Sequence, residues 1–211
     1  MKSLLTSILT IVTLALAFSS TAHAQRYTDS ERLTTTSGGG SGIGIEVRFG
    51  PSFTTDNFGA TDLGDGFGGE FHGNWFISPN FAIFTGVTGI VFDANEDFTG
   101  RDNAITDLGY VAGVKFGGRF GQSRVGWQVH GAANYGEIKL YEEDTDSNIG
   151  ETGHELGWEV GYAVTIALPN KWVLTPGMTY RSRRANLTVN GVSEGVDLNY
   201  VTVGMGFSRT W

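Results

Sequence analysis

The last eleven residues, Val201 to Trp211, alternate large apolar side chains with small ones, and this pattern constrains the fold more than any other stretch of the chain. Successive side chains of a β-strand point to opposite faces. As a strand, the segment has one bulky apolar face, interrupted only by Arg209, and one face of small side chains. A wall between lipid and a narrow interior has this cross-section. The pattern therefore predicts a strand of a membrane-spanning β-barrel.

The amino terminus has the three parts of a secretory signal peptide: Lys2, an apolar run over residues 4–18, and Ala22-His23-Ala24 before Gln25. An uncleaved membrane anchor is the alternative, but the run is shorter than the roughly 20 residues that span a bilayer as a helix. We expect a signal peptide over 1–24, a flexible lead-in over 25–41 and one barrel domain over 42–211. The chain contains no cysteine, so no disulfide holds the fold together.

Eight stretches show the two-residue period of strands, and the chain contains 32 glycines, which disfavours helices. Short turns with Pro, Asn and Gly alternate with longer polar connections. This alternation of short and long connections is typical of an all-β, eight-stranded antiparallel up-and-down transmembrane barrel with its short turns in the periplasm. The expected strands span 42–53, 67–77, 81–93, 107–120, 123–141, 154–168, 171–187 and 196–211, and the longer connections span 54–66, 94–106, 142–153 and 188–195.

Two of these stretches do not keep their apolar residues on one face. The conflicts set Phe81, Ile83 and Val87 against Phe84, Ile90 and Phe92, and Tyr135 against Ile138. Because an extra residue in a strand reverses the faces of all that follow, we expect a bulge or a change of register in each of the two strands.

Charge separates with the two kinds of connection. The short turns contain no acidic residue and carry Arg124 and Lys171, whereas the longer connections contain Arg101 as their only base. This asymmetry favours a barrel with two chemically different ends. Most of the 22 acidic residues lie in or beside the longer connections: Asp56, Asp62, Asp65, Asp93, Glu96, Asp97, Asp102, Asp107, Glu142, Glu143, Asp144, Asp146, Glu151, Glu155, Glu194 and Asp197.

The tryptophans provide an independent indication of a membrane. Amphipathic rings gather at both interfaces of membrane barrels, where apolar contact and a polar edge are both available. Trp75, Trp127, Trp172 and Trp211 fall at the short-turn ends of their strands, and Trp158 falls near the opposite end. We expect these five to be membrane-interface aromatics, with Tyr110, Tyr141, Phe53, Phe67 and Phe92 completing the outer belt.

The opposite faces of the strands carry charged and polar residues among many glycines. An eight-stranded barrel has little room beyond its own side chains, so we expect these residues to form paired ions inside it. Lining of a selective pore is the alternative. The expected interior network consists of Glu46, Arg48, Glu70, His72, Lys115, Arg119, His130, Glu159, Arg181 and Arg183.

Several classes of function find no support in the residues. A formal net charge of −8 argues against nucleic acid as a partner. No spacing singles out a serine with an activating base, so we expect no catalytic residue, no enzyme activity and no cofactor. The acidic run Glu142-Glu143-Asp144 with Asp146 lacks the spacing of an EF-hand. We expect it to be a solvated loop, with binding of divalent cations as the alternative.

The whole stretch after the signal peptide resembles the small eight-stranded outer-membrane barrels, the group that contains the OmpA membrane domain, OmpX and OmpW. The resemblance lies in the signal peptide, the strand count, the loop alternation, the aromatic rims and the terminal strand from Tyr200 to Trp211. It implies a place in the bacterial outer membrane, contact with its lipid and lipopolysaccharide, and insertion by the barrel-assembly machinery. The expected function is a non-enzymatic support of the envelope that presents acidic loops for surface interaction; the alternative is a narrow channel for small or hydrophobic solutes, as in the OmpW type.

Overall fold

The fold of this chain is built from β-strands, as seen in a computed structural model that describes residues 42–56, 63–94, 103–142, 147–189 and 192–211. A single short 3-10 turn, Pro169–Lys171, interrupts them within this part of the chain. No helix among the described residues is long and apolar enough to cross a membrane. The strands are β1 (Gly42–Thr54), β2 (Leu63–Ser78), β3 (Phe81–Ala94), β4 (Asn103–Arg119), β5 (Val125–Glu142), β6 (Ser147–Thr152), β7 (Glu155–Ala167), β8 (Trp172–Val189) and β9 (Val192–Thr210).

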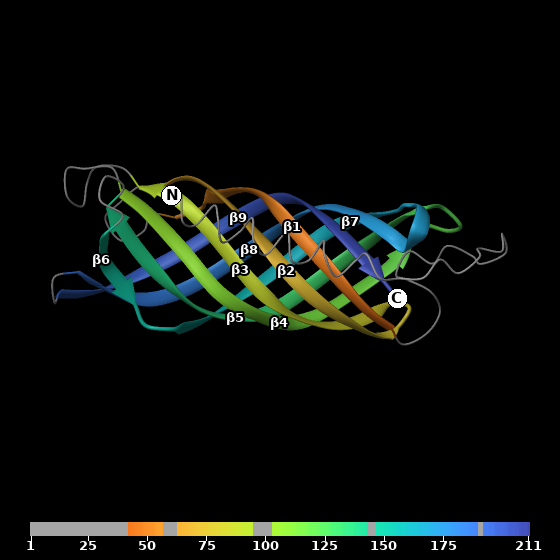
Figure 1. Ribbon diagram of the computed structural model, residues 1–211, viewed down its shortest axis with the longest axis horizontal. Coiled ribbons are helices and arrows are strands. Elements are labelled where there is room, and N and C mark those ends of the chain that lie inside the picture. Colours follow the sequence, from red (N-terminus) through yellow and green to blue (C-terminus); the bar gives the residue numbers. More distant parts are fainter. Residues whose placement is uncertain (1–41, 57–62, 95–102, 143–146, 190–191) are drawn as a thin grey trace. The chain divides into compact units, whose positions relative to one another are not determined.

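All neighbouring strands pair antiparallel, and β9 pairs with β1 to close the sheet. The short strand β6 pairs with β5 and β8 at one end of the barrel, and β7 pairs with the same two strands along the rest of their length. The two therefore share one position, which gives a ring of eight. Figure 1 shows the tilted strands wrapped around a common axis. The expected eight-stranded up-and-down barrel is confirmed.

The strands reach further toward the longer connections than the sequence predicts. β2 begins at Leu63, β8 runs to Val189 and β9 begins at Val192, so the connection expected over 188–195 is mostly strand. We call this end of the barrel the loop end and the opposite end the short-turn end. The expected signal peptide and lead-in, residues 1–41, lie outside the described residues.

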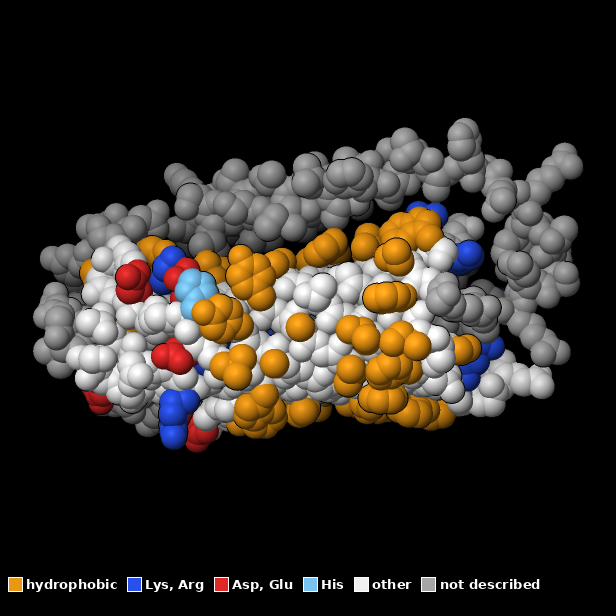
Figure 2. Space-filling model, turned by 90° about the horizontal axis from the view of Figure 1, so that it is seen from below, with side chains coloured by type: hydrophobic (Ala, Val, Ile, Leu, Met, Phe, Trp, Pro, Cys, Tyr) orange, Lys and Arg blue, Asp and Glu red, His pale blue; other side chains and the backbone are white. Residues whose placement is uncertain are grey.

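An apolar band surrounds the outer surface of the barrel. On β1 the outward side chains are apolar from Ile43 to Phe53. Ten residue steps of about 3.3 Å in a strand tilted by about 40° span about 25 Å along the axis, which is the height of the apolar band of membrane barrels. In Figure 2 the band has two dense apolar zones with smaller side chains between them. Such a surface is stable against lipid and costly against water.

Beyond this band, toward the loop end, the outer face of the strands becomes polar and the inner face becomes apolar. Asp93, Arg184 and Asp197 now point outward, whereas Ile90 and Phe92 on β3 and Ile138 on β5 lie inside and are buried. The loop ends of the strands thus have an apolar inside and a polar outside, as a water-soluble barrel does.

The bulges expected where the apolar residues conflict in the third and fifth strands are absent. β3 pairs with β4, and β5 pairs with β4 and β7, with no shift of register. The shifts in the pairing of β2 with β3 lie at its two ends, and the shift in the pairing of β5 with β6 lies at Leu140 and Tyr141, beyond Ile138. Alternation of buried and exposed residues continues through Phe92 and Ile138. The medium outside the barrel changes from lipid to water along these strands, so the side chains on each face change while the register stays the same.

This boundary can be mapped chemically, because the chain contains no cysteine. Single cysteines at the outward positions Asp93 and Asn186 should react with a membrane-impermeant maleimide in reconstituted vesicles. Cysteines at Val160 and Val203, which lie in the apolar band, should stay unlabelled until the protein is unfolded in urea. Equal labelling of both pairs in the folded protein would contradict a boundary between lipid and water at this height.

Candidate functional site

Close approach of strands makes room inside the barrel for large polar side chains. His72 on β2 lies opposite Gly86 on β3, and His130 on β5 lies opposite Gly161 on β7. A Cβ atom at Gly86 would lie 2.6 Å from Cδ2 of His72, and one at Gly161 would lie 2.2 Å from Cε1 of His130. Only glycine leaves these imidazole rings enough space, so the small residues on the inner face are needed for the polar ones.

At the short-turn half of the interior, Glu46 holds two cations. Arg48 Nε donates to its Oε1 at 2.5 Å, and Lys115 Nζ donates to its Oε2 at 2.7 Å. Lys115 Nζ also lies 3.3 Å from Nδ1 of His72 and 4.4 Å from the centre of the Phe84 ring. All of these side chains are buried, so the ions are held away from water and depend on one another.

At mid-height Arg181 is the centre of the network. Its Nη2 lies 2.6 Å from Oε1 of Glu70, and its Nε donates to Oε2 of Glu159 at 2.8 Å. Its Nη1 donates to Thr88 at 2.7 Å and to the hydroxyl of Tyr200 at 2.8 Å. Arg181 is fully buried, so four strands are joined to β8 through one guanidinium group.

Toward the loop end the network continues through Tyr200 and Asp107. The Tyr200 hydroxyl donates to Oδ2 of Asp107 at 2.7 Å, and Arg183 Nη1 donates to Oδ1 of the same carboxylate. Arg183 Nη2 also donates to Oδ1 of Asn134 at 3.0 Å. Four carboxylates and four cations are thereby joined along the barrel axis with no net charge: Glu46, Glu70, Asp107 and Glu159 with Arg48, Lys115, Arg181 and Arg183.

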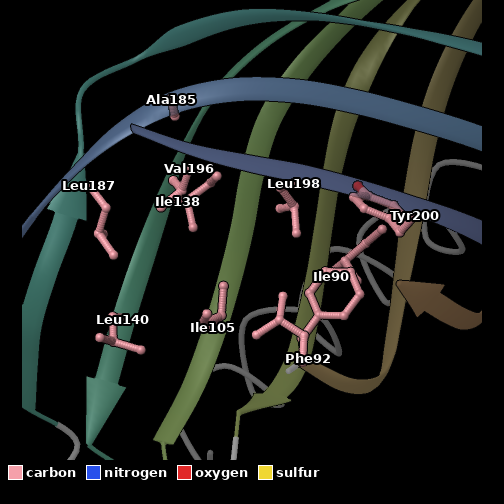
Figure 3. Close-up of a cluster of buried hydrophobic side chains, with 11 residues drawn as sticks. Ile90, Phe92, Ile105, Ile138, Leu140, Ala185, Leu187, Val196, Leu198 and Tyr200 are labelled. Atoms are coloured by element: carbon pink, nitrogen blue, oxygen red, sulfur yellow. The ribbon is translucent and has the colours of Figure 1, made fainter. Parts of the chain in front are cut away.

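Above this network the interior is closed by a cluster of buried apolar side chains, which we call the apolar plug. Figure 3 shows side chains from β3, β4, β5, β8 and β9 pointing toward one another inside the barrel. Phe92 packs edge-on against Tyr200, with ring centres 5.1 Å apart, so the plug and the polar network are in contact. Its members are Leu63, Ile90, Phe92, Ile105, Ile138, Leu140, Ala185, Leu187, Val196, Leu198 and Tyr200.

Two small cavities lie beside residues of the polar network, each of about 30 Å³. Arg48, Glu70 and Thr179 are among the residues that line the first cavity, and Glu46 and Gln128 are among those that line the second. A cavity of this size holds roughly one or two water molecules. These spaces are too small to be a pathway for solutes in this conformation.

The structure places most of the expected network residues in contact with one another, with a difference at Arg183. All acids of the expected network are glutamates, but the carboxylate partner of Arg183 is Asp107, which the sequence placed among the acids in or beside the longer connections. His130 lies 3.8 Å from Glu159 through its Nε2. Arg119 is half-buried at the short-turn end of β4.

Asp107 and Tyr200 belong to the network although we did not expect them there from the sequence. The alternation of the strands could have indicated both. Asp107 is an even number of residues from the inward Lys115 and so shares its face, and Tyr200 is an odd number of residues from the outward Val201 and Val203 and so faces inward. Phe92 is also corrected, because it was expected in the outer belt and is fully buried in the plug.

The tryptophans point outward near the edges of the apolar band. Trp75 and Trp211 lie toward the short-turn end and are exposed, as is Trp158 toward the loop end, and Trp127 and Trp172 are half-buried. Amphipathic rings gather at the interfaces of membrane barrels, and the role of these five as membrane-interface aromatics stays a prediction.

The outer surface at the loop end carries ion pairs. Arg184 donates two hydrogen bonds to Asp197, at 2.8 and 3.0 Å, and the hydrogen bonding lowers the pKa of that carboxyl. Lys139 Nζ lies 2.5 Å from Glu137, whose hydrogen bond raises the pKa of the lysine. Within the described ranges, no group of three or more His, Asp or Glu side chains is arranged to hold a metal ion. The acidic run at 143–146 lies outside the described residues.

No protein-family model and no curated protein sequence matches the chain. Solved structures do match. Neisserial surface protein A aligns with a TM-score of 0.54 at 12% identity over 81% of this chain and 97% of that one. A major outer membrane protein from Thermus thermophilus aligns with a TM-score of 0.56 at 11% identity over 82% and 100% of the two chains.

The outer membrane protein AlkL, solved in lipid bilayers, aligns with a TM-score of 0.53 at 14% identity over 90% of this chain and 97% of that one. Identities this low show the fold alone. These three similar structures agree with the resemblance drawn from the sequence, and so do the apolar band, the ring of eight strands and the filled interior of this barrel. In fold, the chain is a small eight-stranded β-barrel of the bacterial outer-membrane type.

Proposed function

We propose that this chain spans the bacterial outer membrane as a closed, non-conducting barrel that supports the envelope and presents an acidic surface at its loop end. The observation that carries the proposal is the filled interior. Ions that leave water need both pairing and hydrogen bonds. Each of the eight charged groups inside the barrel has an oppositely charged partner and at least one hydrogen bond, although Arg48 Nη2, Glu70 Oε2 and Glu159 Oε1 have no hydrogen-bond partner. The apolar plug excludes water above these groups, so ions meet two barriers in series.

The outer surface supports the second half of the proposal. The strands extend beyond the apolar band at the loop end, where Asp93 lies on the outer face beside the ion pairs of Glu137 with Lys139 and of Asp197 with Arg184. In the sequence, the connections that follow β3 and β5 contain further acids, among them Glu96, Asp97 and Glu143. Rigid scaffolds commonly carry binding function in such exposed segments, and this surface favours cationic groups or bridging divalent cations as partners.

Single-channel recording in planar bilayers tests the closed barrel. We expect no conductance steps above the protein-free bilayer, because no continuous water path is available through paired ions and packed side chains. An open porin inserted under the same conditions is the positive control, and a heat-modifiability gel checks that the barrel is folded. Regular steps whose number rises with the amount of inserted protein would contradict the proposal and favour the channel alternative.

The alternative of passage for hydrophobic solutes needs its own measurement, because such solutes carry no current. Vesicles that contain the barrel should take up an apolar fluorescent solute no faster than protein-free vesicles of the same lipid. Faster uptake with silent conductance would favour a route for apolar solutes through the wall of the barrel.

A further inference from the structure

Arg209 is an outward cation on a strand face that is otherwise apolar. It follows Val203, Met205 and Phe207 on the outer face of β9, and all three of these are exposed. The guanidinium carbon of Arg209 lies 5.6 Å from the centre of the Trp172 ring and 5.7 Å from that of the Trp211 ring. Cations within about 6 Å of an indole ring are attracted to its face. The two rings therefore hold the guanidinium at the edge of the apolar band.

Two further bases lie at the same end of the barrel. Lys171 directly precedes Trp172, which pairs with Arg209 across β8 and β9. Arg124 is next to β7, since its carbonyl accepts a hydrogen bond from the amide of Ala167 at 2.8 Å. Both Arg124 and Lys171 are exposed. We call Arg124, Lys171 and Arg209 the short-turn basic patch.

No acidic side chain balances this patch. The described turns at 79–80, 120–124 and 168–171 contain no Asp or Glu, and the ion pairs among the described residues include none of the three bases. At the right-hand end of Figure 2, basic side chains lie beyond the apolar band and no acidic side chain is visible. The bases of the loop end differ, since Lys139 and Arg184 are paired with carboxylates. Within the described part of the chain, the short-turn end alone presents uncompensated positive charge to an anion.

The geometry points to a phospholipid site. We propose that Arg209, held by Trp172 and Trp211, binds the phosphate of an anionic phospholipid in the leaflet at the short-turn end, and that Arg124 and Lys171 strengthen the attraction. A guanidinium group is a planar fork that donates two parallel hydrogen bonds to a phosphate. Its place at the edge of the apolar band is the height at which lipid headgroups lie. This inference rests on the proposed function, because it requires a barrel that spans a bilayer.

Tryptophan fluorescence provides the test, because Trp172 and Trp211 are themselves part of the site. The barrel is reconstituted in phosphatidylcholine vesicles that contain the same mole fraction of brominated phosphatidylglycerol or of brominated phosphatidylcholine, and bromine quenches the rings it contacts. We expect a relative affinity for phosphatidylglycerol of about fivefold, the contribution of one basic residue near an anionic surface. Arg209→Gln should lower this preference to the residual attraction of Arg124 and Lys171, and Arg209→Lys should retain more of it.

Arg184→Gln is the matched control, since it removes an exposed outward arginine at the opposite end and should leave the preference unchanged. Equal quenching by the two lipids in the unmodified protein would overturn the proposal. So would an equal loss of preference in Arg184→Gln, which would indicate a general effect of charge, or loss of the preference when inorganic phosphate is added at constant ionic strength. Absence of quenching by either lipid would instead show that the barrel is outside the bilayer, and the proposed function would fail first.

Discussion

Replacing Arg181 with methionine is expected to lower the free energy of unfolding by about 3 to 5 kcal/mol, the typical cost of leaving buried charges without their partner. The substitution removes the guanidinium that Glu70 and Glu159 share, and the side chains of both carboxylates are almost fully buried. Neither carboxylate then has a cation in the place that the guanidinium group occupied. Urea unfolding in lipid vesicles, followed by tryptophan fluorescence, measures the loss.

The matched control is Arg184→Met, three residues further along the same strand. The side chain of Arg184 is 83% exposed and pairs with Asp197 on the outer surface, so its loss should change the free energy of unfolding by less than about 1 kcal/mol. Neutralising the partners as well, in Arg181→Met with Glu70→Gln and Glu159→Gln, should recover much of the stability, because uncharged groups need no counter-ion. Equal unfolding midpoints for the two single variants would refute the central role of Arg181.

The period-two pattern made the ring of strands predictable, because lipid imposes the same demand on every outward residue within the apolar band. Trp158 and Val160 on β7 are outward as the alternation requires. Glu159, between them, is inward for the same reason. Inward residues of the network could thus be found by phase alone, without knowledge of their partners.

The ion-pair partners of the network residues and the side chains that fill the loop end were less predictable, because they come from strands that are distant in sequence. Arg183 contacts Asp107, which lies 76 residues away, and no local pattern relates the two. The apolar plug was misread for another reason. We expected large apolar residues to face lipid along the whole strand, so Ile90 and Phe92 looked like a change of register. Strands that continue into water need an apolar inside, and the loop-end lengths of β2, β8 and β9 are not set by local sequence.

Replacing Phe92 with alanine is expected to lower the free energy of unfolding by about 3 to 5 kcal/mol, the range for removal of a buried aromatic ring. Phe92 has no exposed surface and packs against Tyr200 within the plug. The surrounding strands are hydrogen-bonded into a closed ring and cannot collapse fully into the space. Phe120→Ala is the matched control, because Phe120 is 52% exposed at the short-turn end, and its truncation should cost less than about 1 kcal/mol.

The same variant separates the two barriers inside the barrel. Loss of the Phe92 ring opens space in the plug but leaves Arg181 and Arg183 with their carboxylates, so ions still meet the paired network below. We therefore expect Phe92→Ala to be less stable and still silent in planar bilayers. Conductance steps in this variant would show that the plug alone keeps the barrel closed, and an unchanged unfolding midpoint would show that the plug contributes little to folding. If the apolar plug and the ion-pair network are two separate barriers, Phe92→Ala should lower the stability of the barrel without producing a current.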